Sequence, residues 1–392
     1  MIKVGIIGAG LSGLTCSWRL NQKGIKTVVL EKESYVGGRT LYSGAISSGN
    51  FDKRLYELIK EFGLQELAIP LRKEEIGFCT EKGEVLDLKS FLNQIKKKFS
   101  LTEGLKLLNS FNFINSLNLD VENPDAKLAE LREISFEDFL KRYPPKIAEV
   151  LRETACFFGE TEDANPRTIS AEYGISIVRM ANELQSGKAF TFEENNILAL
   201  TNVLAKRIEE KGGQVITLAE VKKIEKNKKG FRIFYQKSGI EKTEDVDKVV
   251  MTVPLNFAKE IFPQLELETD INYFALNSVF AKGSFKYPQM KVMKGDRGNP
   301  ANFVLLYNLV PEYQLITYLP EQNVNLDFLY NHWEIINKKT IKESLPIIGP
   351  KCRVPSLKTN IEGVYLSGDF YYHTFMEVSV VTAEMVAKMI ED

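Results

Sequence analysis

The sequence predicts an α/β fold in which a parallel sheet lies between layers of helices and is interleaved with a second, α+β domain. The chain opens with the apolar run 4–7, a glycine-rich turn and a helical pattern over 14–23, and a second apolar run follows at 27–30. Strands that alternate with helices in this way form parallel sheets. Similar strand and helix patterns return in the middle of the chain and at its C-terminus.

The first turn holds Gly8, Gly10 and Gly13 in the spacing of a dinucleotide-binding loop. Gly8 permits the tight turn, Gly10 lets the backbone approach a pyrophosphate, and Gly13 lets the helix pack closely on the strand. Leu11 and Ser12 lie in the same turn, and the N–H groups at the start of the helix face the phosphates. The order of strand, turn and helix predicts a nucleotide site, with an ordinary strand-to-helix turn as the alternative.

An acidic residue ends the second strand. Glu31 lies about 20 residues beyond the glycines, where a carboxylate accepts hydrogen bonds from a ribose and disfavours a 2′-phosphate. Lys32 follows it and is a further candidate contact of the cofactor. Together these features predict a three-layer, FAD/NAD(P)-binding Rossmann-like domain.

The next segment carries a family resemblance. Gly37, Gly38, Arg39 and Thr40 resemble the GGRxxS signature of the FAD-dependent amine oxidase superfamily, which includes monoamine and polyamine oxidases, protoporphyrinogen oxidases and carotenoid desaturases. The two glycines permit a second close approach to the pyrophosphate, and the Arg39 guanidinium offsets its charge. The resemblance implies FAD, and because no cysteine occupies a clear attachment position we expect FAD to be bound noncovalently.

Two distant segments resemble the same superfamily. A helical pattern at 197–210 precedes strand patterns at 214–217, 221–224, 230–234 and 248–254. The resemblance implies that the backbone of Val221 holds the adenine. Near the C-terminus, residues 363–369 resemble the last FAD strand, which implies that Gly368 and Asp369 contact the ribityl or pyrophosphate side.

Met376 and Glu377 resemble the start of the closing helix of the superfamily. The resemblance implies that the N–H groups at Glu377 and Val378 point at the flavin and stabilise negative charge there. The chain departs from the pattern here, since Val378, Val381 and Thr382 stand where the superfamily has small residues. The Gly-Gly pair expected before the middle helix is also replaced at 193–196, and a loop near Gly49 is short. A noncatalytic member of the fold is therefore an alternative.

The remaining stretches predict a second domain that is inserted into the first. We assign residues 1–71, 188–255 and 343–392 to the FAD-binding domain, and residues 72–187 and 256–342 to the substrate domain. Helical patterns occupy 91–99 and 105–117, with Ser135 capping another helix, and strand patterns occupy 277–285, 302–307 and 313–319. A mixed sheet roofed by helices is the expected architecture.

Catalytic residues are harder to place, because flavin oxidases need little beyond positioning the substrate. Many amine oxidases carry a lysine near the flavin on a strand that residues 276–282 resemble, which makes Lys282 a weak candidate. The alignment is offset by one residue, and such a slip turns a side chain to the opposite face. A solvated Lys282 is therefore the favoured interpretation. Tyr372, in the aromatic run after Asp369, is the other weak candidate, with packing as its alternative.

Composition limits the partners. The 51 basic and 52 acidic residues leave a net charge of −1, which gives no field to attract nucleic acid. The four scattered cysteines and two histidines predict no metal site.

No leader and no apolar run of about 18 residues is present, so we expect a cytoplasmic protein. The helix patterns at 91–99 and 111–114 carry bases beside apolar residues; peripheral membrane contact is the alternative to a packed helix with a solvated lysine face.

The sequence thus predicts an FAD-dependent oxidoreductase in which a small-molecule substrate gives a hydride to flavin N5 and oxygen or another acceptor reoxidises the flavin. An amine is the default substrate. Protoporphyrinogen oxidation and isoprenoid or carotenoid desaturation are the alternatives. An NAD-dependent dehydrogenase would leave residues 37–40 and the Asp369 segment unexplained. The sequence leaves the oligomeric state open.

Overall fold

The first layer of the molecule is a parallel sheet. The computed structural model describes residues 2–43, 46–48, 52–158, 165–185, 189–192, 197–296, 298–310, 312–371 and 375–391. Five strands pair in parallel in the order β18-β12-β1-β2-β8. Their bounds are β1 Lys3–Ile7, β2 Lys26–Leu30, β8 Gln214–Ile216, β12 Lys248–Met251 and β18 Val364–Leu366. The central strands are almost continuously apolar because both faces of the sheet are covered.

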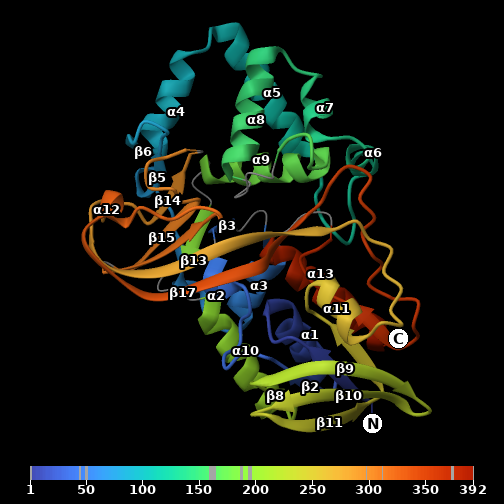
Figure 1. Cartoon of the computed structure of the whole chain (residues 1–392). Coiled ribbons are helices and arrows are strands. Elements are labelled where there is room, and N and C mark those ends of the chain that lie inside the picture. Colours follow the sequence, from blue (N-terminus) through green and yellow to red (C-terminus); the bar gives the residue numbers. More distant parts are fainter. Residues whose placement is uncertain are drawn as a thin grey trace.

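Two different layers cover this sheet (Figure 1). On one face α1 (Leu11–Gln22) packs between α10 (Ile197–Glu210) and α13 (Met376–Glu391). On the other face lies a three-stranded antiparallel sheet of β9 (Ala219–Asn227), β10 (Gly230–Lys237) and β11 (Ile240–Val246). Alternate residues of each parallel strand enter the two cores; Val29 and Val250 face the helices, and Val28 and Val249 face the small sheet. The predicted three-layer fold is confirmed.

A second, mixed sheet lies beside the first and carries helices on top (Figure 1). Its seven strands follow the order β17-β13-β16-β15-β14-β5-β6, antiparallel except for the parallel pair β14 and β5. The bounds are β5 Ile76–Cys79, β6 Val85–Asp87, β13 Asn272–Phe285, β14 Val292–Gly295, β15 Leu305–Val310, β16 Tyr313–Tyr318 and β17 Tyr330–Ile347. The helices are α4 Leu88–Lys97, α5 Leu101–Ser116, α6 Lys127–Arg132, α7 Phe136–Leu140, α8 Pro145–Phe158 and α9 Ala171–Gln185. The expected roofed sheet is therefore present.

Short elements complete the described chain. Three strands form a small sheet in the order β3-β7-β4, with bounds β3 Ile46–Ser48, β7 Ala189–Phe192 and β4 Ala68–Pro70. The short helices are α2 Thr40–Ser43, α3 Lys53–Glu61, α11 Leu255–Ile261 and α12 Leu326–Leu329, with 3₁₀ turns at Gln65–Leu67 and Lys73–Glu75. Within the described ranges, no helix is long and apolar enough to cross a bilayer.

The sequence patterns miss two long strands, β11 and β17. Both are polar and largely exposed, so they lack the apolar alternation that marks a strand. β17 runs through residues 342 and 343, where the sequence places a domain boundary. The division of the chain into two domains stays a prediction, and this strand passes across its last boundary.

Candidate functional site

A cavity of about 620 Å³, here called the inner cavity, lies at the carboxyl ends of β1, β2 and β12. Ligands of open α/β sheets bind at this edge. Most of the predicted cofactor residues line the inner cavity, namely Gly8, Gly10, Leu11, Ser12, Glu31, Lys32, Gly38, Arg39, Thr40, Val221, Gly368 and Asp369. These residues come from five separate segments of the chain, which the fold brings together.

The first glycine turn forms the floor of the inner cavity. Gly8 has a φ of +105°, a conformation that side chains disfavour. A Cβ on Gly13 would lie 2.1 Å from the Gly8 carbonyl oxygen, so Gly13 permits α1 to pack on β1 as predicted. A Cβ on Gly10 would meet no atom within 4 Å. Gly10 thus faces open space, where a bound group can approach its backbone.

The second glycine segment lies against the first. Gly37 N–H donates to the Ala9 carbonyl at 2.8 Å, and a backbone bridge links Gly37 to Gly10. A Cβ on Gly38, which has a φ of +58°, would lie 3.2 Å from the Gly10 Cα. The hydroxyl of Thr40 donates to the Gly37 carbonyl at 2.7 Å and fixes the turn. Two stretches of bare backbone therefore border the same space.

The start of α1 presents positive charge to this space. Gly10 is its N-cap, no side chain caps the helix, and no acidic residue lies in its first turn. The uncompensated N–H groups and the helix dipole favour an anion such as a phosphate. The hydroxyl of Ser12 lies 2.6 Å from that of Ser367, which ties this turn to the C-terminal segment.

Glu31 is buried and held in a fixed orientation. Its Oε2 accepts a hydrogen bond from Ala9 N–H at 2.8 Å, and its Oε1 accepts one from Glu33 N–H at 2.9 Å. A carboxylate has about four acceptor positions, so two more are available for hydroxyl groups in the cavity. The neighbouring Lys32 places its ammonium 5.2 Å from the centre of the Phe257 ring. This arrangement suits the ribose of a nucleotide.

Arg39 joins three segments around the inner cavity. Its Nη2 donates to Asp369 Oδ1 at 2.6 Å, and its Nη1 donates to the carbonyl of Ser344 in β17 at 3.0 Å. Burial alone would lower the pKa of Arg39, but the adjacent Asp369 carboxylate outweighs it and the pKa is raised. The guanidinium therefore stays charged beside the cavity.

The closing helix α13 and the residue before it line the inner cavity, but not with the two residues that the sequence predicts. Neither Glu377 nor Val378 lines the inner cavity, whereas Phe375, Met376 and Ser379 do. The Val378 N–H donates to the Phe375 carbonyl at 3.0 Å, so it is not directed at the cavity. The predicted contact of Val378 with the cofactor therefore has no support from the inner cavity, because its N–H is used within the first turn of α13.

Glu377 instead caps α3. Its carboxylate accepts hydrogen bonds from the N–H groups of Arg54 and Leu55, each at 2.8 Å. Burial raises the pKa of Glu377 to about 7, although these hydrogen bonds oppose the shift. The Glu377 side chain thus stabilises the N-terminus of α3. The structure gives no support for its predicted contact with the cofactor.

The branched residues of α13 do not enter the inner cavity. The side chains of Val378 and Val381 pack against Val121 on the far side of the helix. The hydroxyl of Thr382 accepts from Gly368 N–H at 3.1 Å and donates to the Val378 carbonyl at 2.7 Å. Thr382 therefore holds the Gly368 turn in place.

Of the two weak catalytic candidates, Lys282 is not among the residues that line the inner cavity. Lys282 is exposed, with its ammonium 4.0 Å from Glu312 and 5.3 Å from the centre of the Tyr313 ring. This position agrees with the favoured interpretation of a solvated lysine, and the catalytic alternative for Lys282 has no support from the inner cavity. Tyr372 lies outside the described residues, as does the segment 193–196.

The far wall of the inner cavity was not predicted. It comes from the seven-stranded sheet and consists of Ile76, Phe78, Val292, Lys294, Leu305 and Tyr307. Lys294 is 6% exposed and belongs to a four-residue strand. So short a strand has no periodicity from which a buried lysine could be recognised. Among the described residues, no group of histidine, cysteine and acidic side chains could hold a metal.

This fold and this site define a flavin-dependent oxidoreductase. The family model of flavin containing amine oxidoreductases matches residues 11–281, and the chain belongs to that family. The match to the family model does not include the C-terminal segment with Gly368 and Asp369, because it ends at residue 281.

Solved structures show the same fold over nearly the whole chain. A fatty acid isomerase from P. acnes has a TM-score of 0.69 at 14% identity, covering 98% of both chains. Wild-type putrescine oxidase bound to putrescine has a TM-score of 0.69 at 14% identity, covering 100% of this chain and 99% of that chain. At such low identity the likeness concerns the fold alone.

Curated relatives match in part. Dihydrolipoyl dehydrogenase of Geobacillus stearothermophilus is 24% identical over an alignment of 274 residues, and the match covers 63% of this chain and 55% of that protein. Thiamine thiazole synthase of Methanococcus maripaludis is 42% identical over 66 residues, which are 16% of this chain and 25% of that protein. The chain thus spans less than two thirds of the length of these relatives.

Proposed function

We propose that the protein binds FAD noncovalently in the inner cavity and uses it to oxidise a small organic substrate, with an amine as the default class. The observation that carries this proposal is the pair of bare glycine turns at Gly10 and Gly38 beside the N-terminus of α1. A dinucleotide places its pyrophosphate in such a position. Glu31 is then placed for the ribose, and the guanidinium of Arg39 for the charge of the phosphates.

Two features support noncovalent binding of FAD. The described cysteines Cys16, Cys79 and Cys352 do not line the inner cavity, so they cannot reach a cofactor there. Burial also raises the pKa of the Cys16 thiol to about 12, which keeps it protonated and unreactive.

Val221 lines the cavity near Glu31 and is available to hold the adenine through its backbone.

A bound flavin supplies the redox chemistry, because it accepts a hydride from the substrate and passes the electrons to an acceptor. The chain itself orients the two reactants and excludes water. Ile76, Phe78, Val292 and Leu305 make the far wall apolar, and this wall keeps the reacting centre dry. Lys294 and Tyr307 bring polar groups to the same wall, where they can orient a polar part of the substrate.

One observation favours a bulkier, apolar substrate as the second candidate. The apolar far wall suits protoporphyrinogen-like or isoprenoid compounds as well as an amine. One of the three departures behind the noncatalytic alternative loses its weight, because the side chains of Val378 and Val381 pack against Val121. The other two, at Gly49 and at 193–196, lie outside the described residues.

Anaerobic reduction tests this function. The FAD-loaded protein is mixed in turn with putrescine, a monoamine, protoporphyrinogen and a carotenoid precursor, and the visible flavin band is followed. We expect one class to bleach the band and air to restore it. Retention of the band with all four classes would contradict the proposed substrates, while loss of flavin during loading would contradict the proposed cofactor.

A further inference from the structure

A second cavity, here called the outer cavity, lies under the helical roof. Its volume is about 1000 Å³, and it lies between α4, α5 and α8 above the edge of the seven-stranded sheet at β5 and β14. α4 rests on β5, β6 and the preceding 3₁₀ turn, whereas α5 packs on α8 and α9. The two helices form the arms of an inverted V at the top of the molecule (Figure 1). Cavities of about 300–1,000 Å³ hold small-molecule ligands.

The walls of the outer cavity are mostly apolar. They carry the side chains of Phe91, Leu92, Ile95, Phe99, Leu107, Phe111 and Val150. The basic and aromatic pattern at 91–99 thus places its apolar side chains inside this cavity. Ionisable groups such as Glu153 and Asp296 occur at its edge, so one end of a ligand can remain polar.

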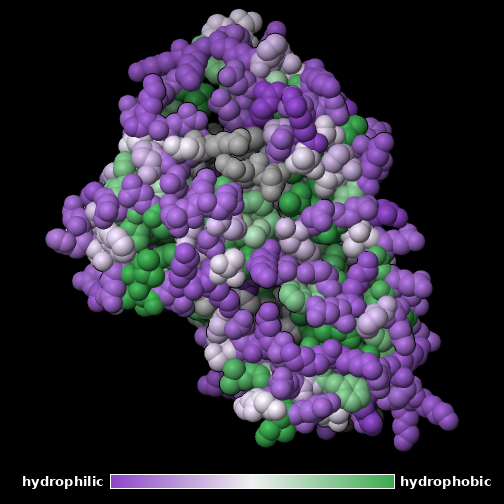
Figure 2. Space-filling view, viewed as in Figure 1, coloured by the Kyte–Doolittle hydropathy of each residue, from purple (hydrophilic) through white to green (hydrophobic). Residues whose placement is uncertain are grey.

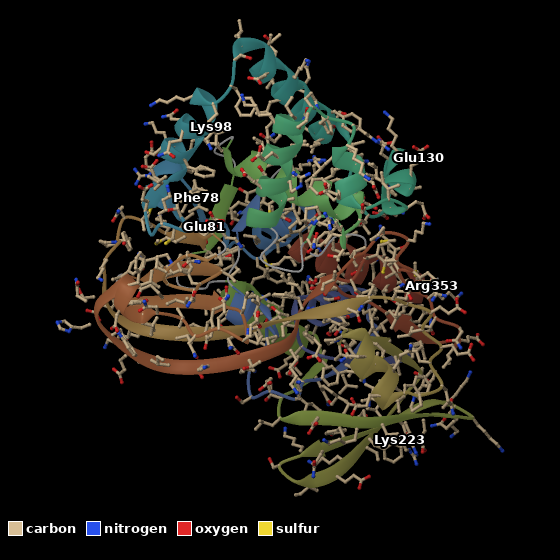
Figure 3. All side chains as sticks on the ribbon, turned by 45° about the horizontal axis from the view of Figure 1, so that its top comes forward. Phe78, Glu81, Lys98, Glu130, Lys223 and Arg353 are labelled. Carbon is tan, nitrogen blue, oxygen red and sulfur yellow. The ribbon has the colours of Figure 1, made fainter. Side chains whose placement is uncertain are left out.

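A thin partition separates the two cavities. Among the described residues, Phe78 and Lys294 line both of them. The Phe78 ring stacks on that of Phe91 in α4, with centroids 4.7 Å apart and planes 15° from parallel. Figure 3 shows Phe78 and Glu81 at the foot of α4, with Lys98 near its tip. Phe78 and Lys294 are paired neighbours on β5 and β14, so the two cavities meet at this pair of residues.

The mouth of the outer cavity is apolar as well. Leu101, Leu105 and Leu108 line it and are 85%, 54% and 55% exposed. Their spacing places them on one face of α5. Hydrophobic side chains are visible among hydrophilic ones over this part of the molecule (Figure 2). Contiguous exposed apolar residues of this kind mark a binding surface.

We propose that the outer cavity binds the apolar chain of a long-chain amphipathic substrate, whose reacting part passes Phe78 into the inner cavity. The apolar wall continues from the leucines of α5 through Phe91 and Phe78 to Val292 and Leu305 beside the flavin position. A narrow chain suits this path, because Phe78 and Lys294 are the described residues that the two cavities share. The inference rests on the proposed function, since the inner cavity must hold the flavin.

Gly104 provides a specific test. It lies in α5 and lines the outer cavity, and a Cβ there would meet no atom within 4 Å. A side chain introduced at this position therefore starts in open space on the wall of the outer cavity. Replacing a helical glycine also favours the helix. Gly104→Trp should close the outer cavity, and Gly104→Ala is the matched control that leaves it open.

The probe is cis-parinaric acid, a fatty acid that fluoresces in apolar surroundings, displaced by laurate, dodecylamine, butyrate and butylamine. We expect wild type and Gly104→Ala to bind the probe alike, and Gly104→Trp to bind at least about tenfold more weakly, which is about 1.4 kcal/mol. The long-chain competitors should displace the probe and the short ones should not. Comparing laurate with dodecylamine identifies the polar end.

Equal binding by Gly104→Trp, or equal displacement by butyrate and laurate, would overturn the inference. Gly104→Leu introduces a smaller side chain. It can be compared with Gly104→Ala in the same way if the tryptophan variant folds poorly. Flavin absorbance of each variant is measured alongside. In the wild type, lost flavin with retained probe binding would count against the proposed function alone, and retained flavin with no probe binding would count against the outer cavity alone.

Discussion

Gly10 and Gly13 lie three residues apart in one turn and serve different purposes. The space beside Gly10 is open, whereas a Cβ on Gly13 would overlap the Gly8 carbonyl. Gly10→Val should therefore keep the thermal stability of the protein and lower its affinity for FAD by at least about tenfold. Gly13→Ala should lower both. Melting curves and FAD titrations separate the two effects, and a Gly10→Val variant that binds FAD like wild type would show that the cofactor lies elsewhere.

Arg39 and Asp369 should stabilise the fold together. Their ion pair is partly buried and links two segments far apart in the sequence. In a double-mutant cycle with Arg39→Gln and Asp369→Asn, urea unfolding should give a coupling energy of about 0.5–3 kcal/mol. Additive effects of the two changes would show that the contact contributes nothing to stability.

Glu377 should make stability depend on pH. Burial raises its pKa from 4.5 to about 7, so the folded chain holds this proton more tightly than the unfolded chain does. The stability that Glu377 contributes should therefore fall as the pH rises from about 4.5 to about 7, by up to about 3 kcal/mol. Urea unfolding of wild type and Glu377→Gln across this range measures it. Parallel pH profiles for the two proteins would contradict the assignment.

At the scale of elements, one hydroxyl joins α13 to the end of β18. Thr382 bonds Gly368 N–H, the Ser367 hydroxyl and the Val378 carbonyl in the core. Thr382→Val removes the acceptor of the buried Gly368 N–H and should cost about 1–3 kcal/mol of stability. FAD affinity should fall too, because the Gly368 turn faces the inner cavity. Thr382→Ser keeps the hydroxyl and should retain both properties; equal losses in the two variants would indicate a packing effect instead.

The elements also show what sequence can and cannot predict. The strands and helix of the nucleotide turn were predictable because glycine spacing and apolar runs are local signals. The strand β13 was found too, and a solvated Lys282 was favoured, but the offset alignment alone could not fix the face that Lys282 occupies. β13 has a register shift against β17 between Phe280 and Ala281, and such a bulge turns side chains over. The position of a bulge depends on the partner strand, which lies about 50 residues away and is itself polar.

At the scale of the whole molecule, the inner cavity depends on segments that lie far apart in the sequence and meet in the fold. The predicted cofactor residues that line the inner cavity come from the N-terminal, middle and C-terminal segments, and each was predicted from a local motif or from its resemblance to the superfamily. The far wall with Phe78 and Lys294 comes from strands β5 and β14, which pair in parallel although over 200 residues separate them. No local pattern marks that pairing. The inner cavity could therefore be predicted on its cofactor side and not on its substrate side.

The most direct test is the near-ultraviolet and visible absorption spectrum of the purified protein, taken before and after addition of FAD and removal of the excess. The inner cavity predicts a flavin band that remains with the protein, is released on denaturation as unmodified FAD, and is absent from Gly10→Val. A protein that holds no flavin after this treatment, although it is folded, would contradict the central claim that these segments form a flavin site.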